Sequence, residues 1–293
     1  SRPSKHSFEG GAIETIIKHD KKDRIIKFCS NNDVSMFNVF MSAYAILLHK
    51  YSNQKDILIS YPYANRDDYH YENILGYFVN VILHRSIINS NNSFLDIVKN
   101  TKANFIEDSK YMDCPLELVY PELNVIADPS FNPLYQVMFA WHEKPRIENN
   151  NLGANWEVDE YANNSSKLDL YLEAQENDND ISLRLNYNSS IFRKQRMDRF
   201  ICDYLKIIDN LLDNPKDKLE EFSLITSNEN ETLKNWNNTD HEYSNDLVFY
   251  NLFLDTARSN LNKTAVICED EKYTYQQLLT MVSAFSDHLI KKG

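Results

Sequence analysis

Glycine is scarce in this sequence. Only five of its 293 residues are glycine, at positions 10, 11, 76, 153 and 293, where ordinary usage of about 7% would give roughly 20. Neither GxGxxG nor GxxxxGK[ST] can be written with glycines so placed, which excludes both common phosphate-binding loops. Any nucleotide connected with this protein is therefore expected to bind residues outside this chain.

Charge and length restrict the possible partners. The net charge is -12, from 31 Lys and Arg against 43 Asp and Glu, and 42% of the residues are hydrophobic. These values are typical of a soluble globular protein of one or two domains. An acidic chain without a basic stripe repels a phosphate backbone, so nucleic acid is not expected as a partner.

Cysteine and histidine do not form a recognisable site. Cys29, Cys114, Cys202 and Cys268 form no CxxC, and no two histidines have metal-ligand spacing, so we expect buried reduced thiols and no bound metal. No apolar run reaches the roughly 20 residues of a membrane helix, and no signal sequence opens the chain. The chain starts with Ser1 and not with Met. We expect a cytoplasmic piece of a longer protein.

Hydrophobic periodicity predicts a mixed α/β domain over the first two thirds of the chain. Residues 12–52 predict a strand and two helices, the second capped by Ser35. Strands are expected at 56–62 and 76–88, and the continuous apolarity of the second predicts burial on both faces. Ser93 is expected to cap a helix that runs to about residue 112, and a strand should follow at 134–141.

The remaining pattern ends in what resembles a fragment. A polar connection at 143–166 precedes a hairpin of 168–176 with 181–187 and a helix at 193–213. From residue 214 to 246 charged and amide residues dominate, which predicts a linker with isolated apolar anchors at Leu224, Ile225, Leu233 and Trp236. A helix at 247–259, a hairpin of 264–268 with 272–275 and a helix at 276–291 are too few elements for a core of their own.

Seven motifs, in order, resemble those of nonribosomal peptide synthetases. Residues 74–85 (ILGYFVNVILHR) resemble IGxFVNTxxxR of the condensation domains, residues 60–66 (SYPYANR) resemble GxPxANR, and residues 111–117 (YMDCPLE) resemble HQDxPFE. Residues 128–139 (DPSFNPLYQVMF) resemble RDxSRNPLFQVMF, and residues 167–173 (KLDLYLE) resemble KFDLxLE. The condensation–adenylation linker resembles residues 224–226 with 236–239, and the LTYxEL motif near the start of adenylation domains resembles residues 273–278.

The resemblance implies both a fold and a missing part. Condensation domains resemble chloramphenicol acetyltransferase, with two lobes facing each other across a tunnel, and their HHxxxDG motif belongs to the first lobe. This sequence has no adjacent histidines. The resemblance therefore implies an α/β (α+β) fold with a mixed sheet flanked by helices. Residues 1–214 would form the second lobe, 215–246 the linker, and 247–293 the truncated start of an adenylate-forming domain.

The implied reaction joins two carrier-bound aminoacyl thioesters through an amide. The expected partners are carrier proteins with their 4'-phosphopantetheine arms, the first lobe, and the rest of the adenylation domain. No cofactor is expected to bind this chain directly, and ATP with Mg²⁺ would serve only the missing adenylation part. Holding two thioesters end to end supplies a large effective molarity, so positioning is expected to carry much of the rate.

Few residues of this chain are expected to act at the reaction centre. Asn132 matches the asparagine of SRNPL, and its amide could donate to an oxyanion or cap the local turn. Asn80 is expected to secure neighbouring backbone, with tunnel lining as the alternative. Asp113 and Glu117 should fix a loop through hydrogen bonds; Arg66 and Asp169 should form a structural pair or face the tunnel. Tyr111, Met112, Ala127 and Phe131 depart from the motifs and weaken transfer of polar roles there.

The sequence supports two functional hypotheses from different classes. The chain is either the acceptor-side part of an amide-forming enzyme, inactive without its first lobe, or a non-catalytic scaffold that docks a carrier protein and orients an adenylation domain. An epimerisation domain, which shares the fold, is a third possibility, disfavoured by the sequence Val79-Asn80-Val81 and by the adjacent linker. Heterocyclisation is disfavoured because NPLYQVMF is of the condensation type.

Overall fold

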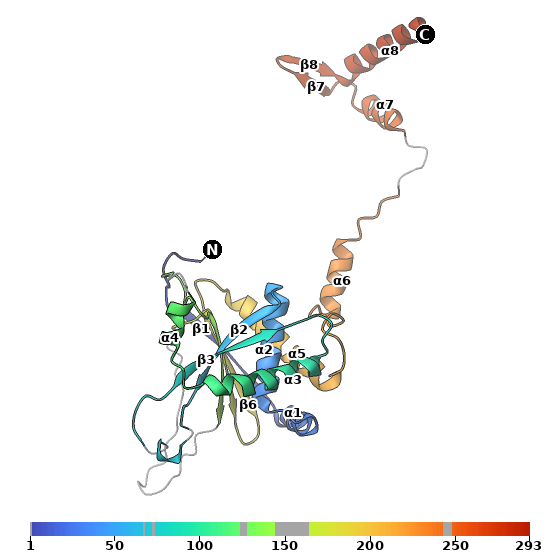
Figure 1. Cartoon of the computed structure of the whole chain (residues 1–293). Helices are drawn as coiled ribbons and strands as arrows, with labels where there is room; N and C mark the ends of the chain where they lie inside the picture. Colours follow the sequence, from blue (N-terminus) through green and yellow to red (C-terminus); the bar gives the residue numbers. More distant parts are fainter. Residues whose placement is uncertain (1, 67, 72–73, 124–127, 144–163, 243–247) are drawn as a thin grey trace. The chain divides into compact units, whose positions relative to one another are not determined.

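The computed structural model describes the chain except residues 1, 67, 72–73, 124–127, 144–163 and 243–247 (Figure 1). Contacts divide the chain into two compact units, residues 1–224 and residues 225–293. The predicted connection at 143–166 lies almost entirely outside the described residues.

A six-stranded mixed sheet forms the centre of the first unit, in the order β1-β6-β5-β4-β2-β3. β4 pairs in parallel with both β2 and β5, and the other neighbours are antiparallel. The strands are β1 (Gly10–Ile17), β2 (Asp56–Tyr63), β3 (Asn80–Ile87), β4 (Val137–Glu143), β5 (Leu170–Glu176) and β6 (Ile181–Asn188). The sheet confirms the expected mixed α/β class.

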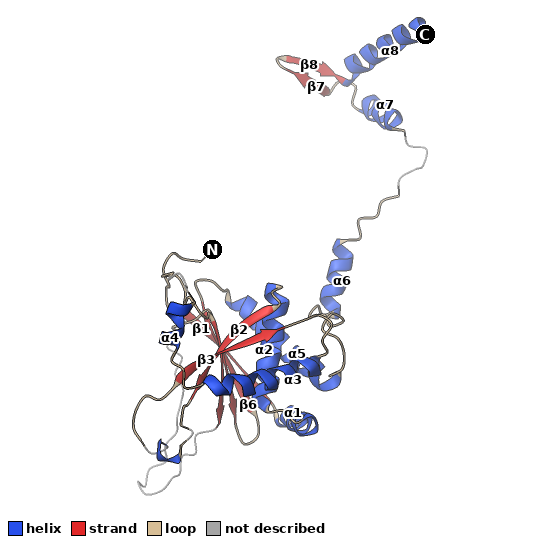
Figure 2. Cartoon of the chain, viewed as in Figure 1, coloured by secondary structure: helices blue, strands red, loops and turns tan. Residues whose placement is uncertain are grey.

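Four helices gather on one side of this sheet, as Figure 2 shows. They are α1 (His19–Asn32), α2 (Met36–Ser52), α3 (Phe94–Asp108) and α5 (Lys194–Asp213). α2 is almost wholly buried and packs against α1, α3 and α5 as well as β2. We call the side of the sheet that these helices cover the helix face and the opposite side the open face. The short elements η1 (Tyr69–Tyr71), η2 (Ser109–Tyr111) and α4 (Leu116–Glu122) lie in the connections.

Strand register gathers the apolar side chains on the helix face. One row of paired positions crosses all six strands, and each member is at most 9% exposed. The row consists of Ile13, Leu185, Leu172, Phe139, Tyr61 and Ile82. Because side chains alternate along a strand, the next residue of each strand lies on the open face.

Helices α2 and α3 begin at the caps that the sequence predicts. The Ser35 hydroxyl accepts a hydrogen bond from the Asn38 backbone N–H, and the Ser35 backbone N–H donates one to Asn38 Oδ1. Ser93 and Asp96 form the same capping box at the start of α3. Each box satisfies donors that the first helical turn leaves without partners.

The strand predicted at 76–88 is shorter and less covered than its apolarity suggests. β3 begins at Asn80, and the preceding Leu75 and Tyr77 are 103% and 89% exposed. β3 lies at the edge of the sheet, and its side chains alternate between buried and accessible. The prediction of burial on both faces is therefore wrong, because a run of apolar residues cannot distinguish a central strand from an edge strand.

The prediction of four buried thiols is also wrong. Cys29 is buried on α1, whereas Cys114, Cys202 and Cys268 are exposed. Burial raises the pKa of Cys29 to about 11. Cys202 lies on α5 beside buried Ile201, but on the side of the helix that does not face the sheet.

The second unit contains little core. It comprises α6 (Ser227–Trp236), α7 (Phe249–Ser259), the hairpin β7 (Thr264–Cys268) with β8 (Glu271–Thr274), and α8 (Tyr275–Lys292). Of its described residues only Ala257 is buried, while Phe249, Phe285 and Ile290 are 84%, 64% and 76% exposed. Helix α6 lies where the composition predicted a linker. Its expected anchor Trp236 is 72% exposed.

Candidate functional site

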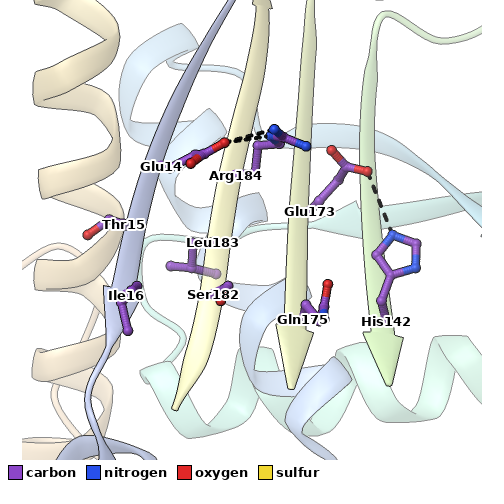
Figure 3. A pocket seen from close by; sticks show the side chains of 9 residues that line it. All are labelled: Glu14, Thr15, Ile16, His142, Glu173, Gln175, Ser182, Leu183 and Arg184. Carbon is purple, nitrogen blue, oxygen red and sulfur yellow. Dashed lines mark hydrogen bonds and ion pairs between the residues drawn. The ribbon is translucent and has the colours of Figure 1, made fainter. Parts of the chain in front are cut away.

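Charged side chains occupy the open face one position along from the apolar row. In register, Arg184 on β6 lies between Glu14 on β1 and Glu173 on β5. The Arg184 guanidinium binds Glu14 through Nε at 2.9 Å and Nη2 at 2.8 Å (Figure 3). The next row brings Gln175 beside His142. Around Glu14, Arg184, Glu173 and His142 the open face is therefore polar and favours water or a polar ligand.

Glu173 links this row to its neighbours. Its Oε2 accepts a hydrogen bond of 2.6 Å from the Asn186 side chain, and its Oε1 lies 3.7 Å from His142 Nε2. A cavity of about 540 Å³ lies here, and Glu14, Ile16, His142, Glu173 and Arg184 are among the residues that line it. The cavity holds charge that is already paired across strands.

A second cavity of about 550 Å³ adjoins the first through Arg184, which lines both. The loop of residues 128–136, the loop of residues 164–169 and the open face contribute its walls. Its lining residues are Asn132, Tyr135, Met138, Ser165, Ser166, Lys167, Leu168, Tyr171, Arg184 and Asn186. We call this the Asn132 cavity.

The hydrogen bonds of Asn132 fix the orientation of its side-chain amide. Oδ1 accepts from the backbone N–H groups of Leu134 and Tyr135 at 3.0 and 3.2 Å and lies 3.4 Å from the Tyr120 hydroxyl. Because backbone N–H groups only donate, the oxygen must face them. The amide nitrogen Nδ2 therefore points away from these groups and is a donor at the cavity, and the Asn132 side chain also makes a hydrogen bond to the Tyr135 phenol. Burial raises the pKa of Tyr135 by more than the hydrogen bond from Asn132 lowers it, so that phenol stays protonated.

The Asn132 cavity has no general base among its described lining residues, which include no histidine, aspartate, glutamate or cysteine. The described residues contain no group of three or more His, Cys, Asp and Glu side chains able to hold a metal ion. No described helix is long and apolar enough to cross a membrane. The geometry can therefore donate hydrogen bonds and position a ligand, but proton removal requires another group.

Asn80 and Arg66 each secure nearby backbone. The Asn80 side chain donates to the carbonyls of Met112 and Cys114 at 2.7 and 3.1 Å. Arg66 donates to the carbonyls of Tyr71, Ile74 and Gly76, and its guanidinium lies 4.2 Å from the centre of the Phe78 ring. Neither residue lines the Asn132 cavity.

The other predicted residues are dispersed. Asp113 and Glu117 make no hydrogen bond to another described residue. Asp169 is 7% exposed and binds Arg2, not Arg66. The structure thus brings Asn132 and Asp169 to neighbouring loops and places Asn80, Asp113 and Arg66 elsewhere.

Sequence reasoning missed Glu14, His142 and Arg184 on the open face. The alternation within the predicted hairpin held part of the signal, because Glu173 and Arg184 both occupy the polar positions of their strands. The pairing of Arg184 with Glu14 on β1, 170 residues away, has no signal in the local pattern.

The sequence model of the Condensation domain family matches residues 1–234. Gramicidin S synthase 2 of Aneurinibacillus migulanus is 28% identical over 294 residues, and surfactin synthase subunit 1 of Bacillus subtilis (strain 168) is 27% identical over 297. Each alignment covers 100% of this chain, but only 7% and 8% of those proteins. The chain therefore spans less than a tenth of these relatives.

Solved structures share the fold. A four-domain nonribosomal peptide synthetase bound to AMP and glycine superposes with a TM-score of 0.80 at 17% identity, covering 100% of this chain and 23% of that one. The X-domain from teicoplanin biosynthesis superposes with a TM-score of 0.68 at 19% identity, covering 76% of this chain and 51% of that one.

Proposed function

Because the chain belongs to the Condensation domain family over residues 1–234, we propose that it is one half of an amide-forming domain in a nonribosomal peptide synthetase. The other half would carry the histidine motif that this sequence lacks. The X-domain structure supports this division, since this chain covers only 51% of it. Residues 1–214, which lie within the compact unit of residues 1–224, would then form the second lobe of the domain.

The proposed reaction is acyl transfer between two carrier-bound thioesters. The amine of the acceptor attacks the thioester carbonyl of the donor, a C–N bond forms and the C–S bond breaks. The pantetheine thiol of the donor leaves, and the proton of the amine passes to a base. The product is an amide on the acceptor carrier. The 4'-phosphopantetheine arms belong to the carriers, so this chain needs no cofactor of its own.

The orientation of Asn132 is the observation that carries this proposal. Its oxygen is held by two backbone N–H groups, so its Nδ2 is a fixed donor at a cavity of about 550 Å³. A fixed donor stabilises charge that develops on a carbonyl oxygen without reorganising during the reaction. The lack of a base among the described lining residues agrees with a histidine supplied by the other half.

Amide formation tests the proposal directly. We expect this 293-residue chain, mixed with a donor and an acceptor aminoacyl carrier protein, to form no dipeptide detectable by mass spectrometry. Adding the amino-terminal half of the gramicidin S synthase 2 condensation domain, in trans or fused, should produce dipeptide. Dipeptide formation by the chain alone would contradict the division into halves. A hybrid that assembles but forms no amide would contradict a catalytic contribution.

Two substitutions at Asn132 separate its possible roles. In the active hybrid, Asn132→Asp keeps an oxygen for the Leu134 and Tyr135 N–H groups but removes the amide donor. We expect kcat to fall about 10²–10³-fold with little change in thermal stability. Asn132→Ala should lower both kcat and thermal stability. If Asn132→Asp retains full activity, the side chain only caps the turn.

A scaffold role is the second candidate, and one observation favours it. The described lining of the Asn132 cavity contains no histidine, aspartate, glutamate or cysteine that could accept the proton of the amine. The chain would then dock a carrier protein and orient the next domain without taking part in chemistry. In that case the hybrid would bind carriers but would form no amide, which the experiment above distinguishes.

We infer a separate role for residues 247–293 as the start of an adenylation domain. The exposed Phe249, Phe285 and Ile290 support this, because such apolar side chains normally pack against further structure. ATP and Mg²⁺ would bind the remainder of that domain. We expect a longer chain that continues past residue 293 into a glycine-rich phosphate loop to bury these three side chains, which hydrogen exchange of α7 and α8 can measure.

A further inference from the structure

The segment of residues 2–10 runs along both loops that wall the Asn132 cavity. The His6 backbone N–H donates to the Pro129 carbonyl at 2.9 Å. The Ser166 N–H donates to the Phe8 carbonyl at 3.0 Å, and the Gly10 N–H donates to the Asn164 carbonyl at 2.9 Å. We call residues 2–10 the strap. It connects the loop of residues 128–136 with the loop of residues 164–169.

Arg2 anchors one end of the strap. Its Nη1 donates to Asp169 Oδ1 at 2.9 Å and to the Ser130 carbonyl at 3.3 Å, and its Nη2 donates to Asp169 Oδ2. The guanidinium carbon lies 5.2 Å from the centre of the Phe131 ring. The hydrogen bond to Asp169 raises the pKa of Arg2, which therefore stays charged. One cation thus holds a residue of each loop.

The nearly buried Asp169 carboxylate depends on the Arg2 guanidinium as its counter-charge. Its side chain is 9% exposed, and its backbone N–H donates to the Gln136 carbonyl at 3.0 Å. A carboxylate in such a position needs a counter-charge, because desolvation of an unpaired charge is costly. Loss of Arg2 should therefore move Asp169 toward water and carry its loop with it.

Gly10 fixes the other end of the strap by close approach. A Cβ at this position would lie 2.4 Å from the Ser165 carbonyl carbon and 2.7 Å from the Ser166 nitrogen. Both atoms belong to the backbone, so no rotation of a side chain can relieve the clash. Only glycine lets the strap lie against residues 165 and 166.

We propose that Arg2 is a positioning residue for the Asn132 cavity. By binding Asp169 and Ser130, it holds the two loops at a fixed separation. It thereby keeps the turn that orients the Asn132 amide toward the cavity in place. The inference rests on the proposed function for its catalytic consequence, but the loop geometry can be tested without it. The strap lies away from the helix-face core, so its loss should alter the cavity and leave the fold intact.

The test compares Arg2→Ala, Arg2→Lys and Gly10→Ala in the 293-residue chain. Arg24→Ala is the matched control, since Arg24 forms an ion pair with Asp213 on the helical side. In Arg2→Ala we expect the amides of residues 129–135 and 164–169 to exchange about tenfold faster, and the NMR signal of the Asn132 side-chain NH₂ to shift. Arg2→Lys should restore these in part, because lysine keeps the charge but not the two-pronged geometry. Gly10→Ala should affect residues 164–166 most.

Three results would overturn the proposal. Unchanged exchange in both loops would show that the strap does not hold them. Faster exchange throughout β5 and β6, with an equal loss of thermal stability, would show that Arg2 merely supports the fold. If Arg24→Ala shifted the Asn132 signal as much as Arg2→Ala, the effect would not be specific to Arg2.

Activity then separates this inference from the proposed function. In the active hybrid, Arg2→Ala should lower kcat about tenfold or more while KM changes less, as expected for lost positioning. If the hybrid forms no amide at all, the proposed function fails while the exchange data still decide the role of Arg2. If the hybrid is active and Arg2→Ala matches the unsubstituted hybrid, the catalytic consequence of Arg2 fails alone.

Discussion

The two faces of the six-stranded sheet differ although the same strands make both. Leu172 and Glu173 are neighbours on β5, yet Leu172 is completely buried under the helices and Glu173 binds Asn186 and lies near His142 on the open face. The helix face is an apolar row that crosses six strands. The open face carries the Glu14, Arg184 and Glu173 row.

The helix face stabilises the fold, whereas the open face contributes walls to the two cavities. The helix face removes apolar surface from water, at about 25 cal/mol per Å², and so stabilises the fold. The open face keeps polar groups that a core would exclude unless they were fully paired. Such a face suits the wall of a cavity that holds polar substrates. Substitutions on the two faces should therefore have different consequences.

The largest expected effect is on the helix face. Leu172→Ala should lower the free energy of unfolding by about 2–5 kcal/mol, because it removes buried methyl groups and leaves a cavity. Glu173→Ala, one residue away, should change it by less than about 1 kcal/mol, since its partners remain accessible to water. Urea denaturation followed by far-UV circular dichroism measures both. Equal losses in the two variants would mean that the open face is also core.

The second prediction concerns the thiols. Burial raises the pKa of Cys29 from its ordinary value of 9.0 to about 11, so its thiolate fraction at neutral pH should fall about a hundredfold. We expect iodoacetamide to alkylate exposed Cys202 at least about a hundredfold faster than Cys29 in the native chain, measured by peptide mass spectrometry. In urea the two rates should become similar. A native Cys29 that reacts as fast as Cys202 would show that α1 is not packed on the helix face.

The smallest effect concerns the start of α3. Hydrogen bonds from Ser93 lower the pKa of Asp96. A lowered native pKa means that the stabilisation is present above the unfolded value near 3.9 and is lost as pH falls through the native value. Asp96→Ala should therefore destabilise the chain by less than about 1 kcal/mol at pH 7, and the difference should shrink below about pH 3.

A double-substitution cycle checks the cause of this pH dependence. In a Ser93→Ala background, Asp96→Ala should destabilise the chain less at pH 7, because the hydrogen bond between the two side chains is already absent. Thermal unfolding at both pH values provides the measurement. An unchanged effect of Asp96→Ala in that background would assign the stabilisation to another interaction.

Local patterns predicted most of the elements. The hairpin expected at 168–176 and 181–187 is β5 (Leu170–Glu176) with β6 (Ile181–Asn188), and the helix expected at 193–213 is α5 (Lys194–Asp213). Alternation and helical periodicity are properties of adjacent residues, so the sequence displays them directly. Helix α6 was missed because its polar composition resembles a linker.

The candidate site was predicted less completely. Asn132 was identified from its motif, but the fixed direction of its amide depends on the Leu134 and Tyr135 backbone. The edge position of β3 and the exposure of Cys202 were not predictable, because exposure depends on which elements pack nearby. The structure also explains one of the five glycines. Gly10 is required by the close approach of Ser165 and not by backbone conformation.

The sequence by itself determined most of the strands and helices, the caps of α2 and α3, and the family, since each depends on residues close together in the chain. Only the tertiary structure decided that Arg184 lies between Glu14 and Glu173, and that Arg2 binds Asp169, which is 167 residues away. These contacts depend on strand register and on the path of the strap. A one-residue change of register would move every charge to the helix face, so packing of that face fixes where the polar groups meet.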